Sequence, residues 1–181
     1  MNIGGNFLLS GGTLNLSRGN GNLTMNVAGN FTINGGTLTE SGSATANTIN
    51  FNGTSTQVFS KTGGTISNTI HFAILSGATV NLGTSQLDGS NGTFNLYTGG
   101  SIITAHSGGI SSSGATGSIQ VSGTRTYASG ANYTFNAPGT QVTGSGLPST
   151  VNTLTVSGTS ALTLSNSYTP ASPLIISNAL T

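Results

Sequence analysis

Glu40 and Asp88 are the two acidic residues of the chain, and their spacing could serve acid–base chemistry. Each closely follows an apolar residue, Leu38 or Leu87. If segments of about 24 residues stack at about 4.8 Å, these carboxylates lie two segments apart on one edge, at about 10 Å, near the wide end for inverting glycosidases. No basic or aromatic cluster accompanies them. We therefore predict no catalytic residues and no enzyme activity, and a glycan-active β-helix enzyme is the second alternative.

Two histidines could bind a metal. The sequence places His71 at an outward strand position that Asn26, Asn50 and Asn95 occupy in neighbouring segments, and His106 in a Ser/Gly-rich corner. A metal site needs converging ligands, but the chain has no Cys and only two acidic residues. The Gly-Gly pairs precede no helix, and no Lys follows them at P-loop spacing. We therefore predict no metal site and no cofactor, with both histidines on the solvated surface.

A row of hydroxyl and amide side chains is the third candidate site. The pattern Thr-apolar-Asn/His-apolar recurs from residues 24, 48, 69 and 93, and it directs the polar side chains outward. Ice-binding solenoids present comparable threonine arrays, so ice binding is the first alternative function. Threonine ladders also stabilise sheets without a ligand, and His71 interrupts this one. The predicted surface ladder comprises Thr24, Asn26, Thr48, Asn50, Thr69, Thr93 and Asn95.

An internal repeat would position these side chains. Residues 25–38 read Met-Asn-Val-Ala-Gly-Asn-Phe-Thr-Ile-Asn-Gly-Gly-Thr-Leu, and residues 1–14 are a near copy. Alternating segments begin at residues 24, 48, 69, 93 and 118, which indicates a nearly constant period. Self-similarity at such a period is typical of solenoids and other repeat architectures.

The alternation predicts strands with one buried face. Each period carries two further apolar groups, as around Phe31 and Leu38, and glycine-containing dipeptides separate them. We therefore predict an all-β fold, a right-handed parallel β-solenoid with three short strands in each coil of about 21–25 residues and about eight coils in all. One predicted inner column joins residues 25, 49, 70, 94 and 119, and the other joins residues 27, 51, 72, 96 and 121.

The repeat also predicts the domain organisation. Residues 1–121 form regular coils, and residues 122–181 continue the solenoid with less regular spacing. Because Met1 occupies the repeat position of Met25, we expect one continuous domain cut from a longer chain.

The composition excludes several partners. Charged residues make up 3% of the chain, against about 25% in an average soluble domain. The three basic residues form no patch for nucleic acid or anionic lipid, and no apolar run approaches the roughly 20 residues of a membrane helix. A net charge of +1 opposes association of copies very little. We therefore predict no nucleic-acid binding, no membrane insertion and end-to-end self-association through open strand edges; glycans or other cell-surface material are further candidate partners.

The C-terminal third resembles a known group of proteins. Residues 133–136 read Tyr-Thr-Phe-Asn, residues 141–144 read Gln-Val-Thr-Gly, residues 147–156 read Leu-Pro-Ser-Thr-Val-Asn-Thr-Leu-Thr-Val, and residues 162–167 read Leu-Thr-Leu-Ser-Asn-Ser. These segments resemble repeats of large secreted surface proteins of Bacteroidetes-type bacteria, which usually leave the cell through the type IX secretion system. The N-terminal two thirds resemble filamentous-haemagglutinin-type adhesin coils.

The resemblance implies an extracellular or cell-surface stalk, adhesin or fibre component without catalytic residues. The export signal and the sorting domain are expected to lie outside this segment. We therefore expect a structural or adhesive β-solenoid that acts as a stiff rod for display, adhesion or self-assembly.

Overall fold

The computed structural model describes residues 1–43, 46–159, 161–169 and 174–176, and its regular elements are all β-strands. The strands are β1 (Asn2–Ile3), β2 (Phe7–Asn15), β3 (Thr24–Val27), β4 (Phe31–Thr39), β5 (Asn47–Phe51), β6 (Gln57–Lys61), β7 (Thr65–Ile66), β8 (Ile70–Ile74), β9 (Thr79–Asn81), β10 (Phe94–Leu96), β11 (Ser101–Thr104), β12 (Arg125–Tyr127), β13 (Asn132–Phe135), β14 (Gln141–Val142), β15 (Thr153–Val156), β16 (Leu162–Thr163) and β17 (Leu174–Ile176). The predicted C-terminal region, residues 122–181, is therefore described only in part.

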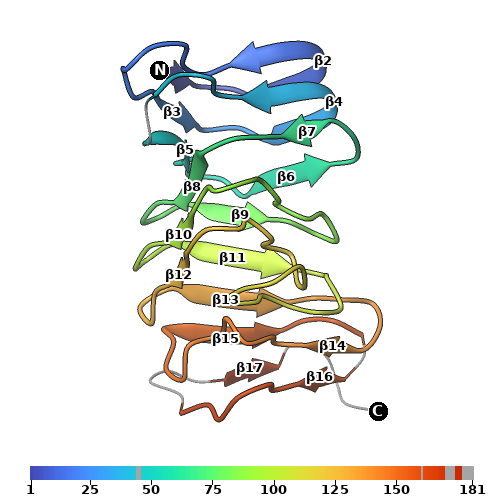
Figure 1. The fold of residues 1–181 in the computed structure, drawn as a ribbon. Helices are drawn as coiled ribbons and strands as arrows, with labels where there is room; N and C mark the ends of the chain where they lie inside the picture. The colour runs from blue at the N-terminus through green and yellow to red at the C-terminus, as the bar shows by residue number, and fades with distance from the viewer. Residues whose placement is uncertain (44–45, 160, 170–173, 177–181) are drawn as a thin grey trace.

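The strands form parallel sheets that run along one axis. A six-stranded sheet has the order β1-β3-β5-β8-β10-β12, and a nine-stranded sheet runs β17-β15-β13-β11-β9-β6-β4-β2 with β7 beside β4. A third, two-stranded sheet pairs β14 with β16. Figure 1 shows the turns stacked one upon another from β2 at one end to β16 and β17 at the other. The predicted all-β parallel solenoid is confirmed, with about seven turns where the sequence predicted about eight.

The third side of the solenoid is built differently along the stack. In the first two turns it continues directly from the second side, within the nine-residue strands β2 and β4. Gly12 and Gly36 allow this bend because both have positive φ, 68° and 72°. Further down, the third side carries short pairings: β7 beside β4, the isolated parallel bridge between Leu87 and Ile119, and β14 beside β16.

The pairing confirms the first inner contacts and corrects the later ones. Met25 lies beside Ile49 in the next turn, as predicted. The next neighbour of Ile49 is Phe72, so the predicted contact between Ile49 and Ile70 is wrong. Ile70 instead lies beside Asn47. A shift of two residues keeps every side chain on its own face, so alternation could not distinguish these registers.

The prediction for the fifth coil is also wrong. Phe94 pairs with Arg125 and Leu96 pairs with Tyr127, so this turn is longer than the turns before it. The sequence predicts Ile119 beside Phe94 and Val121 beside Leu96. Ile119 instead lies on the third side of the solenoid, before β12, beside Leu87.

The long turn contains an extra layer on the third side, formed by residues 105–124 between β11 and β12. The backbone N–H of Ser118 donates to the Gly109 carbonyl oxygen at 2.8 Å, and that of Ile110 donates to the Thr143 carbonyl oxygen at 3.0 Å. The segment therefore fills the space between the turn above and the turn below. The nine-stranded sheet continues past it, because β11 pairs directly with β13.

One continuous apolar core occupies the interior. Phe31 stacks between Phe7 and Phe59, with ring centroids at 4.5 and 5.9 Å, and the edge of Phe51 meets it at 5.8 Å. Each fully buried side chain of this kind stabilises the fold by about 1.5 to 3 kcal/mol. Because a turn packs mainly against its neighbours, the turns should be unstable singly and stable as a stack.

Candidate functional site

The predicted threonine column lies on the outer face of the six-stranded sheet. Thr24 pairs with Thr48, and Thr48 pairs with His71 rather than with Thr69. The predicted position of Thr69 in this ladder is therefore wrong. Thr93 lies next to His71, since its hydroxyl is 2.8 Å from the His71 Nδ1 atom and its backbone N–H donates to that nitrogen at 3.2 Å.

The neighbouring column carries the predicted asparagines. The Asn26 amide donates to the Asn2 side-chain oxygen at 2.8 Å, and the Asn50 amide donates to that of Asn26 at 2.9 Å. Asn50 pairs with Ala73, and Ala73 pairs with Asn95, so the ladder is interrupted at its fourth position. These amides bond to one another along the stack. The arrangement stabilises the sheet and offers a shorter, less regular array than ice binding would use.

Glu40 is buried beside Asn68 and Thr69, the residues that precede β8. It is 6% exposed, and Oε1 accepts a hydrogen bond from the backbone N–H of Thr69 at 3.3 Å. Asn68 donates from its amide to the backbone carbonyl of Glu40 at 2.5 Å. The Oε2 atom is buried without a hydrogen-bond partner among the described residues. The Glu40 carboxylate therefore accepts from the backbone of the next turn, and the Glu40 backbone carbonyl accepts from the Asn68 amide.

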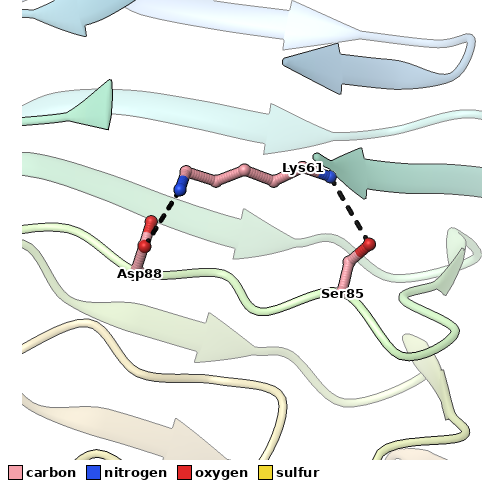
Figure 2. A network of polar contacts seen from close by, with 3 residues as sticks. All are labelled: Lys61, Ser85 and Asp88. Atoms are coloured by element: carbon pink, nitrogen blue, oxygen red, sulfur yellow. Dashed lines mark hydrogen bonds and ion pairs between the residues drawn. The ribbon is translucent and has the colours of Figure 1, made fainter. Parts of the chain in front are cut away.

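Asp88 forms an ion pair instead. Figure 2 shows Lys61 reaching from the end of β6 to Asp88, where Nζ lies 3.1 Å from Oδ2. The backbone N–H of Lys61 donates to the Ser85 hydroxyl at 3.4 Å. The side chains of Lys61 and Asp88 are 16% and 42% exposed, so the pair contributes at most about 1 kcal/mol. Glu40 and Asp88 thus have different partners among the described residues, Thr69 for Glu40 and Lys61 for Asp88.

The histidines are half-buried and hydrogen-bonded rather than fully solvated. Gly108 donates its backbone N–H to His106 Nδ1 at 3.0 Å, and the His106 Nε2 atom lies 3.3 Å from the Gln86 amide nitrogen. Across the described residues, no three His, Asp or Glu side chains lie together as a metal site would require. His71 therefore joins neighbouring turns on the outer face of the six-stranded sheet, and His106 helps to close the corner after β11.

Arg125 forms a polar centre that sequence reasoning missed. It occupies the inner position below Phe94 and is 7% exposed. Its guanidinium donates only to backbone carbonyls: to Val121 from Nε at 2.9 Å and from Nη2 at 2.8 Å, to Gly114 from Nη2 at 2.6 Å, and to Ser111 from Nη1 at 3.2 Å. The five N–H donors of a guanidinium suit such a cage. Arg125 thereby fixes the extra layer of residues 105–124 to the core.

The surroundings of Arg125 shift the pKa values of three groups. Burial lowers the pKa of Arg125, and the nearby Tyr127 opposes this effect. Burial also raises the pKa of Tyr127 and of Tyr133 above the usual phenol value. The hydroxyls donate to the carbonyl oxygens of Ser111 at 3.1 Å and Ala128 at 2.7 Å. Only the alternation of Arg125 with Tyr127 in the sequence could have indicated that both side chains point inward.

Two buried glutamines form a second motif that sequence reasoning missed. Gln57 donates to the carbonyl oxygens of Val27 at 2.9 Å and Gly29 at 2.6 Å, and it accepts from the Gly53 N–H at 2.8 Å. Gln141 repeats the arrangement: it donates to two backbone carbonyls at 2.9 Å and accepts from an N–H four residues before it. The sequence signal was Thr-Gln-Val, which occurs at residues 56–58 and 140–142.

In the part of the chain that the structure describes, no helix has the length and apolar character to cross a membrane. Comparison with protein-family models, with curated proteins and with solved structures finds no match to this chain.

Proposed function

We propose that this chain is a structural and adhesive segment of an exported bacterial surface protein or extracellular filament, where it acts as a stiff rod. The observation that carries the proposal is the pair of long parallel sheets around one continuous core. Every inner turn is held by backbone hydrogen bonds and apolar contacts on both of its sides. Bending or opening such a turn breaks both sets of contacts, which suits a part that must extend or display something.

The use of the chemically capable side chains supports a role without catalysis. Glu40 accepts from the backbone of the next turn, Asp88 pairs with Lys61, and Arg125 is enclosed by carbonyls. Each of these groups already has a partner within the same chain. A catalytic acid would instead need to face a substrate-sized opening with a second group beside it.

The outer surface supports adhesion to uncharged polymers. The outward positions of β3 and β5 carry threonine and asparagine, and charged residues are 3% of the chain. Hydroxyl and amide groups can exchange hydrogen bonds with glycans without an electrostatic contribution. An extracellular location follows from the resemblance to secreted surface repeats and is part of the same proposal.

A polysaccharide retention assay tests the proposal. Beads coated with different polysaccharides are incubated with the folded chain, and both retained protein and newly formed reducing ends are measured. We expect retention on some glycans, no new reducing ends, and rod-like small-angle X-ray scattering. The contrary result is that the parent chain releases reducing ends, and that Glu40→Gln or Asp88→Asn abolishes this release while the fold stays intact. That result would contradict the adhesive rod and support a glycan-active enzyme.

A further inference from the structure

Three β-turns of the same design lie one above another in the middle of the stack, where β8, β10 and β12 lead into β9, β11 and β13. They comprise residues 75–78, 97–100 and 128–131. In each turn the backbone N–H of the fourth residue donates to the carbonyl oxygen of the first, at 2.9 to 3.1 Å. Hydrogen bonds also join the turns, because Gly77 donates its N–H to the Gly99 carbonyl oxygen at 3.0 Å and Gly99 donates to that of Gly130 at 2.9 Å. The three turns therefore form one fixed surface.

Each turn carries a hydroxyl side chain at its second position. These side chains are Ser76, Thr98 and Ser129, and all three are exposed. Their hydroxyls bond to no other group in the described part of the chain. Stacked parallel turns repeat at about 4.8 Å, so the three positions form a row on the outer surface at about that interval. Each hydroxyl can donate one hydrogen bond to a ligand and accept others from it.

Glycine at the third position of the next turn leaves the space that these side chains occupy. A Cβ atom at Gly99 would be 2.5 Å from the Ser76 Oγ atom, and a Cβ atom at Gly130 would be 3.0 Å from the Thr98 Oγ1 atom. The first two hydroxyl side chains therefore lie against the backbone of the turn below them. Their position is set before any ligand arrives, which lowers the entropy lost on binding.

Tyr97 is the first residue of the middle turn and the only exposed aromatic residue in the described part of the chain. Its side chain is 51% exposed, whereas Leu75 and Ala128, at the same position of the neighbouring turns, are half-buried. The hydroxyls of Tyr127 and Tyr133 bond to backbone carbonyls inside the fold, but that of Tyr97 bonds to no described group. A tyrosine ring held at a fixed turn offers an apolar face and a polar edge with few torsions to immobilise.

We propose that these three turns form a binding site for an uncharged polysaccharide. The face of the Tyr97 ring packs against the C–H face of one sugar unit, and the row of hydroxyls bonds to the hydroxyls of that unit and its neighbours. Charge favours this occupant. No residue of the three turns is charged, whereas an average protein domain has about 25% charged residues and would call for complementary charges. The inference rests on the proposed adhesive role and names the surface that performs it.

Retention on beads coated with cellulose, chitin or amylose tests this site, with albumin-coated beads for comparison. Five proteins are measured: the parent chain, Tyr97→Ala, Tyr97→Phe, the double variant Ser76→Ala/Ser129→Ala, and Val58→Ala. Val58 is the matched control, because its outward side chain on β6 is 43% exposed and lies outside the three turns. All replaced side chains are exposed, so each variant should melt near the temperature of the parent chain.

We expect Tyr97→Ala to weaken binding to at least one of the three polysaccharides about tenfold or more, and the double variant to weaken it about threefold or more. Tyr97→Phe keeps the ring and should bind within about threefold of the parent chain, as should Val58→Ala. Equal retention of the parent chain and Tyr97→Ala would overturn this site and leave adhesion to another surface.

Two other results would also overturn the site. A parent chain that none of the three polysaccharides retains would contradict the adhesive role itself. Retention on albumin-coated beads that Tyr97→Ala weakens equally would replace the polysaccharide by a protein partner.

Discussion

The buried polar residues of this chain are satisfied mainly by backbone groups of their own or neighbouring turns. Arg125 shows this most clearly, since its guanidinium donates to the carbonyls of three residues in the 105–124 segment. A buried cation without such partners would be strongly destabilising. Arg125 therefore helps to fix the position of this irregular segment.

Replacing Arg125 should be costly for this reason. Arg125→Met removes the donors to the Val121 and Gly114 carbonyls, whereas the Ser111 carbonyl keeps its bond from the Tyr127 hydroxyl, so the free energy of unfolding should fall by about 1 to 3 kcal/mol. Arg125→Lys should also destabilise, because a compact ammonium cannot reach all three carbonyls together. Chemical denaturation measures both, with Arg18→Met at an exposed position as the control, expected within about 0.5 kcal/mol of the parent. An Arg125→Lys variant as stable as this control would contradict the role of the hydrogen bonds from Arg125 to the backbone carbonyls.

The buried tyrosines predict a loss of stability in alkali. In the folded chain, burial raises the pKa of Tyr127 and Tyr133 above the value of about 10 in an unfolded chain. The unfolded chain therefore releases these protons first, and stability present below about pH 10 is lost as the pH rises further. Denaturation across this range should show a shallower decline for Tyr133→Phe than for the parent. An equal decline of stability with pH in the two proteins would contradict the raised pKa of the buried Tyr133.

At the scale of the elements, periodicity predicted the fold better than the register. The near copies at residues 1–14 and 25–38 correctly predicted the pairing of Asn2 with Asn26 and of Phe7 with Phe31. The third coil was misplaced because residues 69–72 repeat the pattern of residues 48–51, whereas the strand runs on through Ile74. Arg125 was missed because a search for apolar columns passes over a charged residue in the core.

The candidate site was harder to predict than the fold. The outward direction of Asn26 and Asn50 followed from alternation, but their mutual hydrogen bonds depend on exact neighbours in adjacent turns. The pairing of Lys61 with Asp88 depends on a corner of variable length between them. Such contacts join residues across turns, so an error of two residues in register removes them.

The buried glutamines predict a specific cost at a corner. Gln57→Leu keeps an apolar stem but leaves the Gly53 N–H and the Gly29 carbonyl without this partner, while the Val27 carbonyl keeps its bond from the Asn52 N–H, so the free energy of unfolding should fall by about 3 kcal/mol. Val58→Thr is the control, since the adjacent side chain points outward and is 43% exposed, and it should change stability by less than about 0.5 kcal/mol. Equal denaturation midpoints for the two variants would contradict the structural role of Gln57.

At the scale of the whole molecule, the few charges leave stability to backbone ladders and apolar columns. One ion pair, between Lys61 and Asp88, joins side chains in the described part of the chain. Neighbouring turns supply most of the contacts of each turn, so the rod is stabilised by its length. A net charge of +1 gives little electrostatic repulsion between copies of such a rod.

The interrupted ladder predicts that the chain does not shape ice. Thr24 and Thr48 continue into His71, and the asparagine column continues into Ala73, so no long flat row of hydroxyls is formed here. Thermal hysteresis and ice-crystal morphology should therefore match those of a buffer with an inert protein. Concentration-dependent hysteresis that Thr48→Val abolishes would restore the ice-binding alternative.

Engineered disulfides test the stacked parallel turns most directly, because the chain has no Cys of its own. Thr48 and His71 are register partners, and parallel neighbours at about 4.8 Å satisfy disulfide geometry. Thr48 and Thr69 are two residues out of register, at about 8 Å, which is too far. The account predicts that Thr48→Cys/His71→Cys oxidises readily within one chain and that Thr48→Cys/Thr69→Cys does not. Preferential oxidation of the second pair, or of neither, would contradict it.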